Sequence, residues 1–586
     1  MTSVRSGSGL CILRTAATAA VLLATGPVAA HGQAPRVFVL DQAAQTVTAY
    51  DVATGRSERT AAVSGRRLLR AADGRRLLVL DRGKGEDKGN NGFRATTKAS
   101  VTVLDGQSLA TQSQIELGTG LDDVVMLSAK GDLLSVVCPG FRGKTPAESQ
   151  PRELITVDVA AGRILSRVEL TRASNEILAT PDGQTIVVLS SREAPKKAAA
   201  LSPAELRFID ARSGKTVTTL AIEGDPHGPV LSPDGAHVYL LDRGKPHDNP
   251  DKNRNGRLHI VSLAAHEITS ADAGSNPRGL VLDEARGQLL MLSNGTPRKG
   301  AGAQDLPGEL RVLRAGKAGA AIDVAASPER ILAGGDDTTL HVLGYAGVTT
   351  LSSPALTPQT FKTSTIIGDA PAAISADGRR LWVILLGEYL QTYDLAKGEH
   401  VAEARTGRMG KKTWLAFKAA IKTAASESSG RREAAESGRS YYSYTEYSVV
   451  APHGDIAERP DGKAVYALNS QTDDVTIVDT ATGQVIEKVA AGGFGIRFMP
   501  PASVALVPSA TAVHAIDLAS HQRAADILAD TDAGFDHVEL SPDARLAVVH
   551  GAKGVLFVNA STGKVVGTLV RARDIADVAI DWGTTR

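Results

Sequence analysis

A short polar stretch between two apolar runs has the spacing with which a calcium loop begins. Positions 1, 3, 5 and 6 of the helix–loop–helix calcium motif would be Asp251, Asn253, Asn255 and Gly256. Positions 9 and 12 would be His259 and Ser262, which lack the carboxylates that complete the motif. Two interpretations stay open: calcium as a cofactor held by Asp251, Asn253 and Asn255, or a hairpin turn whose Asp and Asn side chains cap backbone groups.

A second set of chemically active residues recurs at the middle position of Pro-x-Gly-like triplets. Aligned on the Ser-Pro-Asp-Gly that follows, these positions hold Asp123, Asn175, His227, Arg278, Ala372, His453 and Asp536, with Glu176 and His537 adjacent. Pro-His-Gly itself occurs twice, at 226–228 and 452–454. Histidines and carboxylates that converge can bind a metal or act as acid and base. Polar residues at such positions can also be merely hydrated.

A third set is basic and lies in long connections of the N-terminal half. Clusters of Lys and Arg follow apolar strands at regular intervals, and equivalent positions of a repeat would gather on one face. The candidate anion-binding residues are Arg82, Lys84, Arg142, Lys144, Arg243 and Lys245. Such a cluster attracts anionic partners, although nearby carboxylates such as Asp81 and Asp87 partly offset it.

Residues 407–450 interrupt the pattern of short strands. Trp414, Phe417 and Ile421 fall on one face of a helical repeat flanked by lysines, and "YYSYTEY" follows. The spacing predicts one short helical insertion. It would pack on its own protein, contact a partner, or lie through 411–425 on an anionic membrane surface.

The elements that must position all these residues are short repeated strands. "SPDGAHVYLLD", "RPDGKAVYALN" and "TPDGQTIVVLS" each give a Pro-Asp-Gly turn followed by an apolar strand, and a second strand, a turn and a third strand come next. One such unit cannot bury its own faces, so units must stack, and radial stacking predicts an all-β fold, a β-propeller. About eleven four-stranded blade units are expected, from counting the second strands of the repeat.

These repeats resemble the YVTN-type β-propeller family. "GDPHGPVLSPDGAHVYLLD" and "DDVTIVDTATGQVIEKV" carry the resemblance, which covers most of the chain. It implies the propeller fold and places the triplet residues on the innermost strands. It says little about activity, because members of the family range from binding proteins to lactonase-like and dehydrogenase-associated propellers.

The number of units raises the question of how the rings are arranged. A ring usually has four to eight blades, so we expect two propellers, 31–325 and 326–586, rather than one enlarged ring. The chain opens with a middle-type strand, "RVFVLD", and ends with "DIADVAIDW", which is typical of a strand that begins a blade. The last strand could therefore complete a blade with the N-terminus.

The N-terminal residues, the cysteine count and the net charge narrow the class of protein. Arg5 and Arg14 precede a short apolar run and small residues up to Ala30, which predicts a signal peptide over 1–30 and a periplasmic or secreted protein. The single cysteine beyond it, Cys138, excludes an internal disulfide. Lys and Arg number 65 against 64 Asp and Glu, so nucleic acid is not an expected partner.

Two functions follow from these observations. The first is an exported, non-catalytic propeller that binds a protein, a glycan or an anionic small molecule through its loop face. The alternative is a lactonase-like or other hydrolase with a site on the inner strands around His227 or His453. No cofactor-attachment or nucleotide-binding motif is visible in the sequence.

Overall fold

The computed structural model describes residues 35–582, with gaps inside that range. The gaps are 72–73, 88–92, 122–124, 142–148, 172–173, 191–202, 245–254, 284–285, 295–306, 327, 335–338, 345–346, 353–354, 364–369, 386–388, 407–455, 470–471, 500–502, 525, 530–531, 543–544 and 560–562. The predicted signal peptide (1–30) and the predicted helical insertion (407–450, with 411–425) lie outside the described residues. Within them every regular element is a strand, and no helix capable of crossing a membrane is found.

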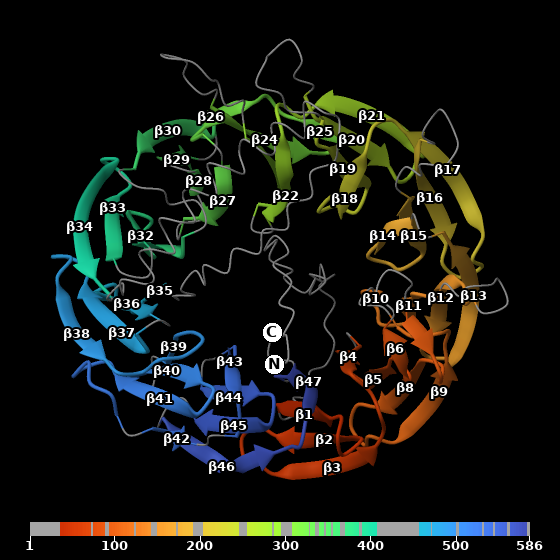
Figure 1. Cartoon of the computed structure of the whole chain (residues 1–586), viewed down its shortest axis with the longest axis horizontal. Coiled ribbons are helices and arrows are strands. Elements are labelled where there is room, and N and C mark those ends of the chain that lie inside the picture. The colour runs from red at the N-terminus through yellow and green to blue at the C-terminus, as the bar shows by residue number, and fades with distance from the viewer. Residues whose placement is uncertain are drawn as a thin grey trace, which may run out of the picture.

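The described residues form eleven antiparallel sheets of four or five strands, with a small hairpin beside one of them, and the predicted β-propeller is confirmed. We number the sheets as blades 1–11 and the strands of each blade from the inside of the ring outward (Figure 1). Apart from blade 1, whose innermost strand β47 comes from the end of the described chain, the strands of each blade follow one another in chain order and pair with antiparallel neighbours.

The first six blades occupy the N-terminal half. Blade 1 contains β47 (Ile575–Asp581), β1 (Arg36–Asp41), β2 (Thr46–Asp51) and β3 (Ser57–Ala62). Blade 2 contains β4 (Arg67–Arg70), β5 (Arg76–Asp81), β8 (Ser100–Asp105) and β9 (Thr111–Glu116), and the hairpin of β6 (Gly85–Asp87) and β7 (Phe93–Ala95) lies between β5 and β8 in the chain. Blade 3 contains β10 (Val125–Leu127), β11 (Leu133–Cys138), β12 (Arg152–Asp158) and β13 (Arg163–Leu170). Blade 4 contains β14 (Ser174–Ala179), β15 (Thr185–Ser190), β16 (Ala204–Asp210) and β17 (Thr216–Ile222). Blade 5 contains β18 (Pro226–Leu231), β19 (His237–Asp242), β20 (Arg257–Ser262) and β21 (Glu267–Asp272). Blade 6 contains β22 (Pro277–Asp283), β23 (Gln288–Ser293), β24 (Gly308–Arg314), β25 (Lys317–Ala318) and β26 (Ile322–Val324).

The remaining five blades follow the same order. Blade 7 contains β27 (Pro328–Ala333), β28 (Thr339–Gly344), β29 (Gly347–Ser352) and β30 (Thr357–Lys362). Blade 8 contains β31 (Ala372–Ile374), β32 (Arg380–Leu385), β33 (Tyr389–Asp394) and β34 (Glu399–Arg405). Blade 9 contains β35 (Ile456–Glu458), β36 (Ala464–Asn469), β37 (Asp474–Asp479) and β38 (Val485–Val489). Blade 10 contains β39 (Arg497–Met499), β40 (Val504–Ser509), β41 (Ala512–Asp517) and β42 (Leu528–Ala529). Blade 11 contains β43 (Phe535–Leu540), β44 (Leu546–Gly551), β45 (Gly554–Asn559) and β46 (Lys564–Arg571).

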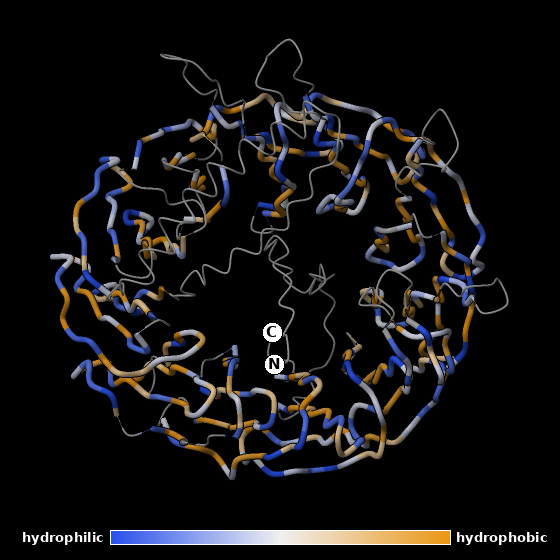
Figure 2. Tube along the Cα trace, in the orientation of Figure 1, coloured by the Kyte–Doolittle hydropathy of each residue, from blue (hydrophilic) through white to orange (hydrophobic). Residues whose placement is uncertain are grey.

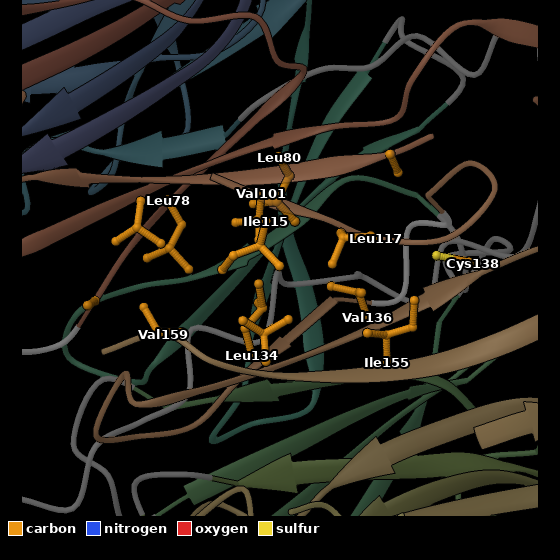
Figure 3. Close-up of a cluster of buried hydrophobic side chains, with 14 residues drawn as sticks. Leu78, Leu80, Val101, Ile115, Leu117, Leu134, Val136, Cys138, Ile155 and Val159 are labelled. Atoms are coloured by element: carbon orange, nitrogen blue, oxygen red, sulfur yellow. The ribbon is translucent and has the colours of Figure 1, made fainter. Parts of the chain in front are cut away.

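The core lies between blades, not within them. In β5 the run "RLLVLD" sends Leu78 and Leu80 toward blade 3 and Leu77 and Val79 toward blade 1. Because both faces of a middle strand are covered, its apolar residues are continuous instead of alternating with polar ones. Figure 3 shows the cluster between blades 2 and 3, in which Cys138 is a buried apolar member. Figure 2 shows that hydrophobic segments recur all around the ring.

The blades form a single ring, so the expected division into two propellers is wrong. The described residues contain eleven apolar clusters, and each is shared by two consecutive blades. The expected boundary between 325 and 326 falls at one of these interfaces, where Leu290 and Leu310 of blade 6 pack with Leu340 and Val342 of blade 7. Figure 1 shows the same continuous ring. The repeat count was correct, but it contained no information on where a ring closes.

The ring closes where the last strand joins the first three. β47 pairs with β1 antiparallel over six residues, and the predicted completion of a blade by the two ends of the chain is confirmed. Val548 and Phe557 of blade 11 pack with Val37 and Val39 of blade 1. On its other side β47 bonds to blade 2, because the Leu68 N–H donates to Asp577 Oδ2 at 2.8 Å and Arg70 is ion-paired with the buried Asp581 at 2.7 Å.

Removal of β47 should therefore disrupt the ring. A chain that ends at Ala572 exposes the β1 edge and loses the ion pair with Arg70, and we expect its thermal unfolding midpoint to fall by about 10 °C or more, or its unfolding to become non-cooperative. The measurement is circular dichroism during heating. A chain that ends at Trp582 is the matched control and should unfold like the full chain. Equal midpoints for all three chains would show that β47 does not close the ring.

Candidate functional site

The two faces of the ring differ in the connections that they carry. In every blade the first strand begins at the face of the ring at which the second strand ends, as the pairing of Pro226 with Asp242 shows. The connection from the second to the third strand and the connection to the next blade therefore both lie at this face. We call this the loop face. The opposite face, which we call the turn face, carries the connections from the first to the second and from the third to the fourth strand.

All the long connections of the described blades are on the loop face, and they are grouped. The second and third strands are joined by thirteen or more residues only in blades 2–6, by 82–99, 139–151, 191–203, 243–256 and 294–307. The same connection has at most four residues in blade 1 and in blades 7–11, as at 345–346 and 552–553. The connection 406–455 between blades 8 and 9 also joins two strand ends at the loop face. Turn-face connections have ten residues at most. Apart from 406–455, the long connections therefore belong to one arc of five adjacent blades.

The candidate anion-binding residues are at the roots of these loops where they are described. Lys84 and Arg243 are exposed, and Arg82 is partly buried. The two Asp-Arg-Gly-Lys motifs have the same local structure, because Gly83 N–H donates to Asp81 Oδ1 and Gly244 N–H donates to Asp242 Oδ1, both at 2.9 Å. Arg142, Lys144 and Lys245 lie outside the described residues.

The triplet residues form bulges at the loop-face end of the innermost strands. In four blades the strand register skips the middle residue, which is Asn175, Arg278, Glu329 or Asp536. In blade 5 the extra residue follows His227. A bulge adds an unpaired residue and redirects its side chain, and bulges often occur beside binding sites. Asp123 and His453 lie outside the described residues.

Several of these bulges connect neighbouring blades. Arg278 of blade 6 donates through Nη2 to Glu329 of blade 7 and through Nε to Asn294 Oδ1 at 2.9 Å. The Gly228 N–H of blade 5 donates to Glu176 Oε2 of blade 4 at 2.5 Å. These contacts give the bulge residues a structural role in joining the blades.

Glu176 and His227 lie near each other at the border of blades 4 and 5. Burial raises the pKa of Glu176, and the Gly228 N–H and the nearby His227 ring lower it in part. His227 Nδ1 lies 3.2 Å from the Asp225 carbonyl oxygen. A carboxyl group with a raised pKa next to an imidazole has the composition of an acid–base pair.

A second cluster lies on blade 11 and at its border with blade 1. His537 and His550 are direct cross-strand partners, and their rings stack with centroids 5.1 Å apart. Asp536 Oδ1 is 2.7 Å from His537 Nδ1, and Glu539 Oε1 is 3.7 Å from His550 Nε2. Burial raises the pKa of Asp577, on which His550 acts in the opposite direction. The sequence analysis identified Asp536 and His537 but missed His550. His550 could have been found only from the strand register, which places it opposite His537.

The candidate inner-strand residues do not converge. His227 is on β18 of blade 5 and Asp536 is on β43 of blade 11, on opposite sides of the ring (Figure 1). In the part of the chain that the structure describes, no group of three His, Cys, Asp or Glu side chains is close enough to hold a metal ion. The structure therefore does not bring His227 and Asp536 together.

The candidate calcium ligands are only partly described. Asp251 and Asn253 lie outside the described residues. Asn255 Nδ2 donates to Asp272 Oδ2 at 3.1 Å, so its amide interacts with a carboxylate. Gly256 is required because a Cβ there would come within 2.5 Å of the Pro277 ring in the next blade. For these two positions the structure shows a side-chain hydrogen bond and packing between blades. The calcium interpretation remains a prediction.

Comparison with known proteins finds likeness in solved structures only. No protein-family model matches the chain, and no curated protein matches it. Dihydro-heme d1 dehydrogenase NirN in complex with DHE is 16% identical, with a TM-score of 0.35 over 64% of this chain and 72% of that one. A eukaryotic initiation factor is 11% identical, with a TM-score of 0.38 over 78% and 96% of the two chains. Kuenenia stuttgartiensis hydrazine synthase is 14% identical, with a TM-score of 0.25 over 71% and 96%. Likeness at this level gives no information on function.

The pKa of Glu176 gives a testable dependence of stability on pH. Because the pKa of Glu176 is raised in the folded state, the folded chain holds the proton on this carboxyl group more tightly than the unfolded chain does. The resulting contribution to the free energy of unfolding is complete below the ordinary carboxyl pKa, and it is lost as the pH rises through the folded-state pKa. Glu176→Gln keeps an oxygen acceptor for the Gly228 N–H but has no charge to bury. We expect its unfolding midpoint to equal or exceed that of the wild type at pH 7.5, and the difference to shrink toward pH 4. Thermal scans of both proteins from pH 4 to pH 8 measure this difference. If the unfolding midpoint of the Gln variant falls relative to that of the wild type as the pH rises from 4 to 7.5, the prediction is wrong.

Proposed function

We propose that this chain is an exported, non-catalytic β-propeller with YVTN-type repeats that binds an anionic glycan or an acidic protein through the loop face of blades 2–6. The observation that supports this most strongly is the asymmetry of the two faces. Eleven similar blades need only short turns to form a ring, yet five adjacent blades carry long connections on a single face. Loops presented by a rigid scaffold are the usual location of binding residues.

The charge of these connections indicates the class of ligand. Connections 82–99, 139–151, 191–203, 243–256 and 294–307 contain 16 Lys and Arg against 7 Asp and Glu, whereas the whole chain has a net charge of only +1. The rest of the chain is therefore acidic, and the positive charge is concentrated on one arc. A concentrated charge attracts extended anionic ligands and speeds their encounter with the surface.

Export and membrane contact are separate parts of the proposal. The charged and apolar pattern of residues 1–30 supports a signal peptide, and hence a periplasmic or secreted location. Residues 411–425 belong to a connection whose two ends are at the loop face. A basic amphipathic segment there supports contact between that face and an anionic membrane surface.

Charge reversal on the loop face tests the binding function. In mature 31–586 we would replace the exposed Lys84 and Arg243 by Glu, and compare elution from immobilised heparin and polyglutamate. The double variant should elute at clearly lower salt, and the slope of log affinity against log salt should fall by about two, because two ionic contacts are lost. Arg82 is left intact because it is partly buried and engaged in other contacts.

The matched control makes the same change of charge on the turn face. Lys215 and Lys397 are exposed residues of turns between third and fourth strands, and their replacement by Glu leaves the loop face unchanged. This control should elute with the wild type. If both double variants elute together, at any salt concentration, the loop face is not the binding surface.

A hydrolase remains the second candidate, because the carboxyl group of Glu176 has a raised pKa and interacts with His227. A lactone or ester substrate would then react at the inner edge of blades 4 and 5, where this pair could exchange protons with it. His227→Ala and Glu176→Gln should each lower hydrolysis of a test lactone panel about 100-fold or more. His537→Ala, on the opposite side of the ring, is the control. Hydrolysis that is absent in the wild type, or unchanged in both variants, would exclude this function.

A further inference from the structure

Two buried oxygen atoms without a hydrogen-bond partner lie at the border between blades 8 and 9, at the loop face. Thr406, which follows β34, is fully buried, and its Oγ1 has no partner. Asp474, the first residue of β37, has a buried Oδ1 that also has no partner. Burying a hydroxyl or a carboxylate oxygen without a partner costs free energy, so both atoms require an explanation.

The polar side chains around these atoms face the same region. Val478 of β37 packs in the apolar cluster shared with blade 8. Because alternate residues of a strand share a face, Asp474 and Thr476 also point toward blade 8. Asn469, the strand-register partner of Asp474, donates through Nδ2 to the Thr406 carbonyl oxygen at 3.4 Å, and the Thr476 hydroxyl donates to the same oxygen at 3.4 Å. One carboxylate, two hydroxyl groups and a carbonyl group therefore gather at this border.

The spacing of these oxygens is compatible with a bound cation. Contacts of 3.4 Å are longer than ordinary hydrogen bonds, so the two donors use little of the capacity of the Thr406 carbonyl oxygen. Two oxygens that are each about 2.4 Å from one Ca²⁺ ion, at a right angle, lie about 3.4 Å apart. Thr406 O and Thr476 Oγ1 have this separation. Carboxylate, hydroxyl and carbonyl oxygens are the ligands that hard cations prefer.

The position of Asp474 is charged in three other blades, where it is ion-paired. The equivalent residues are those that pair with the last residue of the second strand. Their ion pairs are Glu153–Arg167 at 3.2 Å, Arg257–Glu223 at 2.9 Å and Glu309–Arg311 at 3.2 Å. Among the residues that the structure describes, no Lys, Arg or His side chain forms an ion pair with Asp474. Its carboxylate therefore calls for a positive charge from another source.

We propose that the border of blades 8 and 9 binds a hard cation, Ca²⁺ or Na⁺, through the Asp474 carboxylate, the hydroxyl and carbonyl oxygens of Thr406 and the Thr476 hydroxyl. The cation supplies the charge that Arg167 and Arg311 supply in other blades. A single carboxylate gives a weak site, with a Kd on the order of 10⁻⁴ to 10⁻³ M. The site is separate from the proposed loop-face function, which uses blades 2–6.

Titration calorimetry of mature 31–586, freed of metal by a chelator, tests the site. CaCl₂ and NaCl are separate probes, and choline chloride controls for ionic strength. We expect one or both cations to bind, and the cation that binds distinguishes a divalent from a monovalent site. Asp474→Asn should raise the Kd about tenfold or more, because the affinity of such sites follows the number of charged ligands.

Thr406→Val distinguishes a ligand from a residue that only stabilises the fold. Val has the shape of Thr without Oγ1, and this oxygen has no protein partner. Without added cation the variant should therefore unfold at the same temperature as the wild type or higher, while its Kd for the cation rises about fivefold or more. A lower unfolding midpoint without cation, together with an unchanged Kd, would contradict the proposal.

The matched control is Asp473→Asn, which removes the same charge one residue away. Asp473 is exposed and lies against Gly492 of the connection between blades 9 and 10, on the other side of blade 9. This variant should bind the cation like the wild type, and so should Asp251→Asn in the candidate calcium loop. If neither cation binds the wild type, if Asp474→Asn binds unchanged, or if Asp251→Asn alone abolishes binding, the proposal is wrong.

Discussion

The pairing of β1 with β47 is the constraint on which the rest of the structure depends. Every blade shares one apolar cluster with each neighbour, so no blade is complete until both neighbours are present. Blade 1 meets this condition only when the end of the chain supplies its innermost strand. Without that strand the cluster of Val37, Val39 and Phe557 would lose the apolar side chains that pack against it from β47, which include Ile575, Val578 and Ile580. Ring closure thus stabilises all the interfaces at once.

A closed ring separates stability from recognition. The middle strands and the turn face vary little from blade to blade, because they must fit two neighbours. On the turn face Asp105, Asp210, Asp479 and Asp517 each accept backbone and side-chain bonds from a Ser or Thr of the same turn, which lowers the pKa of each carboxyl group. The loop face has no such restriction, and insertions there leave the interfaces unchanged. The long basic connections of blades 2–6 and the 406–455 connection are all found at this face.

The strands and the number of repeats could be predicted from the sequence, because their signals lie within a few residues. Contacts between residues that are far apart in the chain could not. Continuous apolar runs such as "RLLVLD", each near an Asp-Gly or Thr-Gly turn, identify the strands, and their repetition gave the correct number of units. The single ring could not be predicted, because it depends on the angle between packed blades, to which residues such as Leu290 and Leu340 contribute without a local signal. The stacking of His550 on His537 depends on strand register and a bulge. The close approach of Gly55 to the backbone of Val566 and Gly567 joins the two ends of the chain and has no local signal either.

The order of the strands in blade 1 also determines how this protein can be made. Synthesis proceeds from the N-terminus, so β1 emerges with one edge unpaired, and its partner β47 emerges only after all the other described strands. Until then β1 presents a row of free backbone N–H and C=O groups that can pair with another chain. The strands of the other ten blades are synthesised while this edge of β1 is still unpaired. The nascent chain would thus need a holding factor, or fast folding after release, to avoid joining a second copy through the same edge.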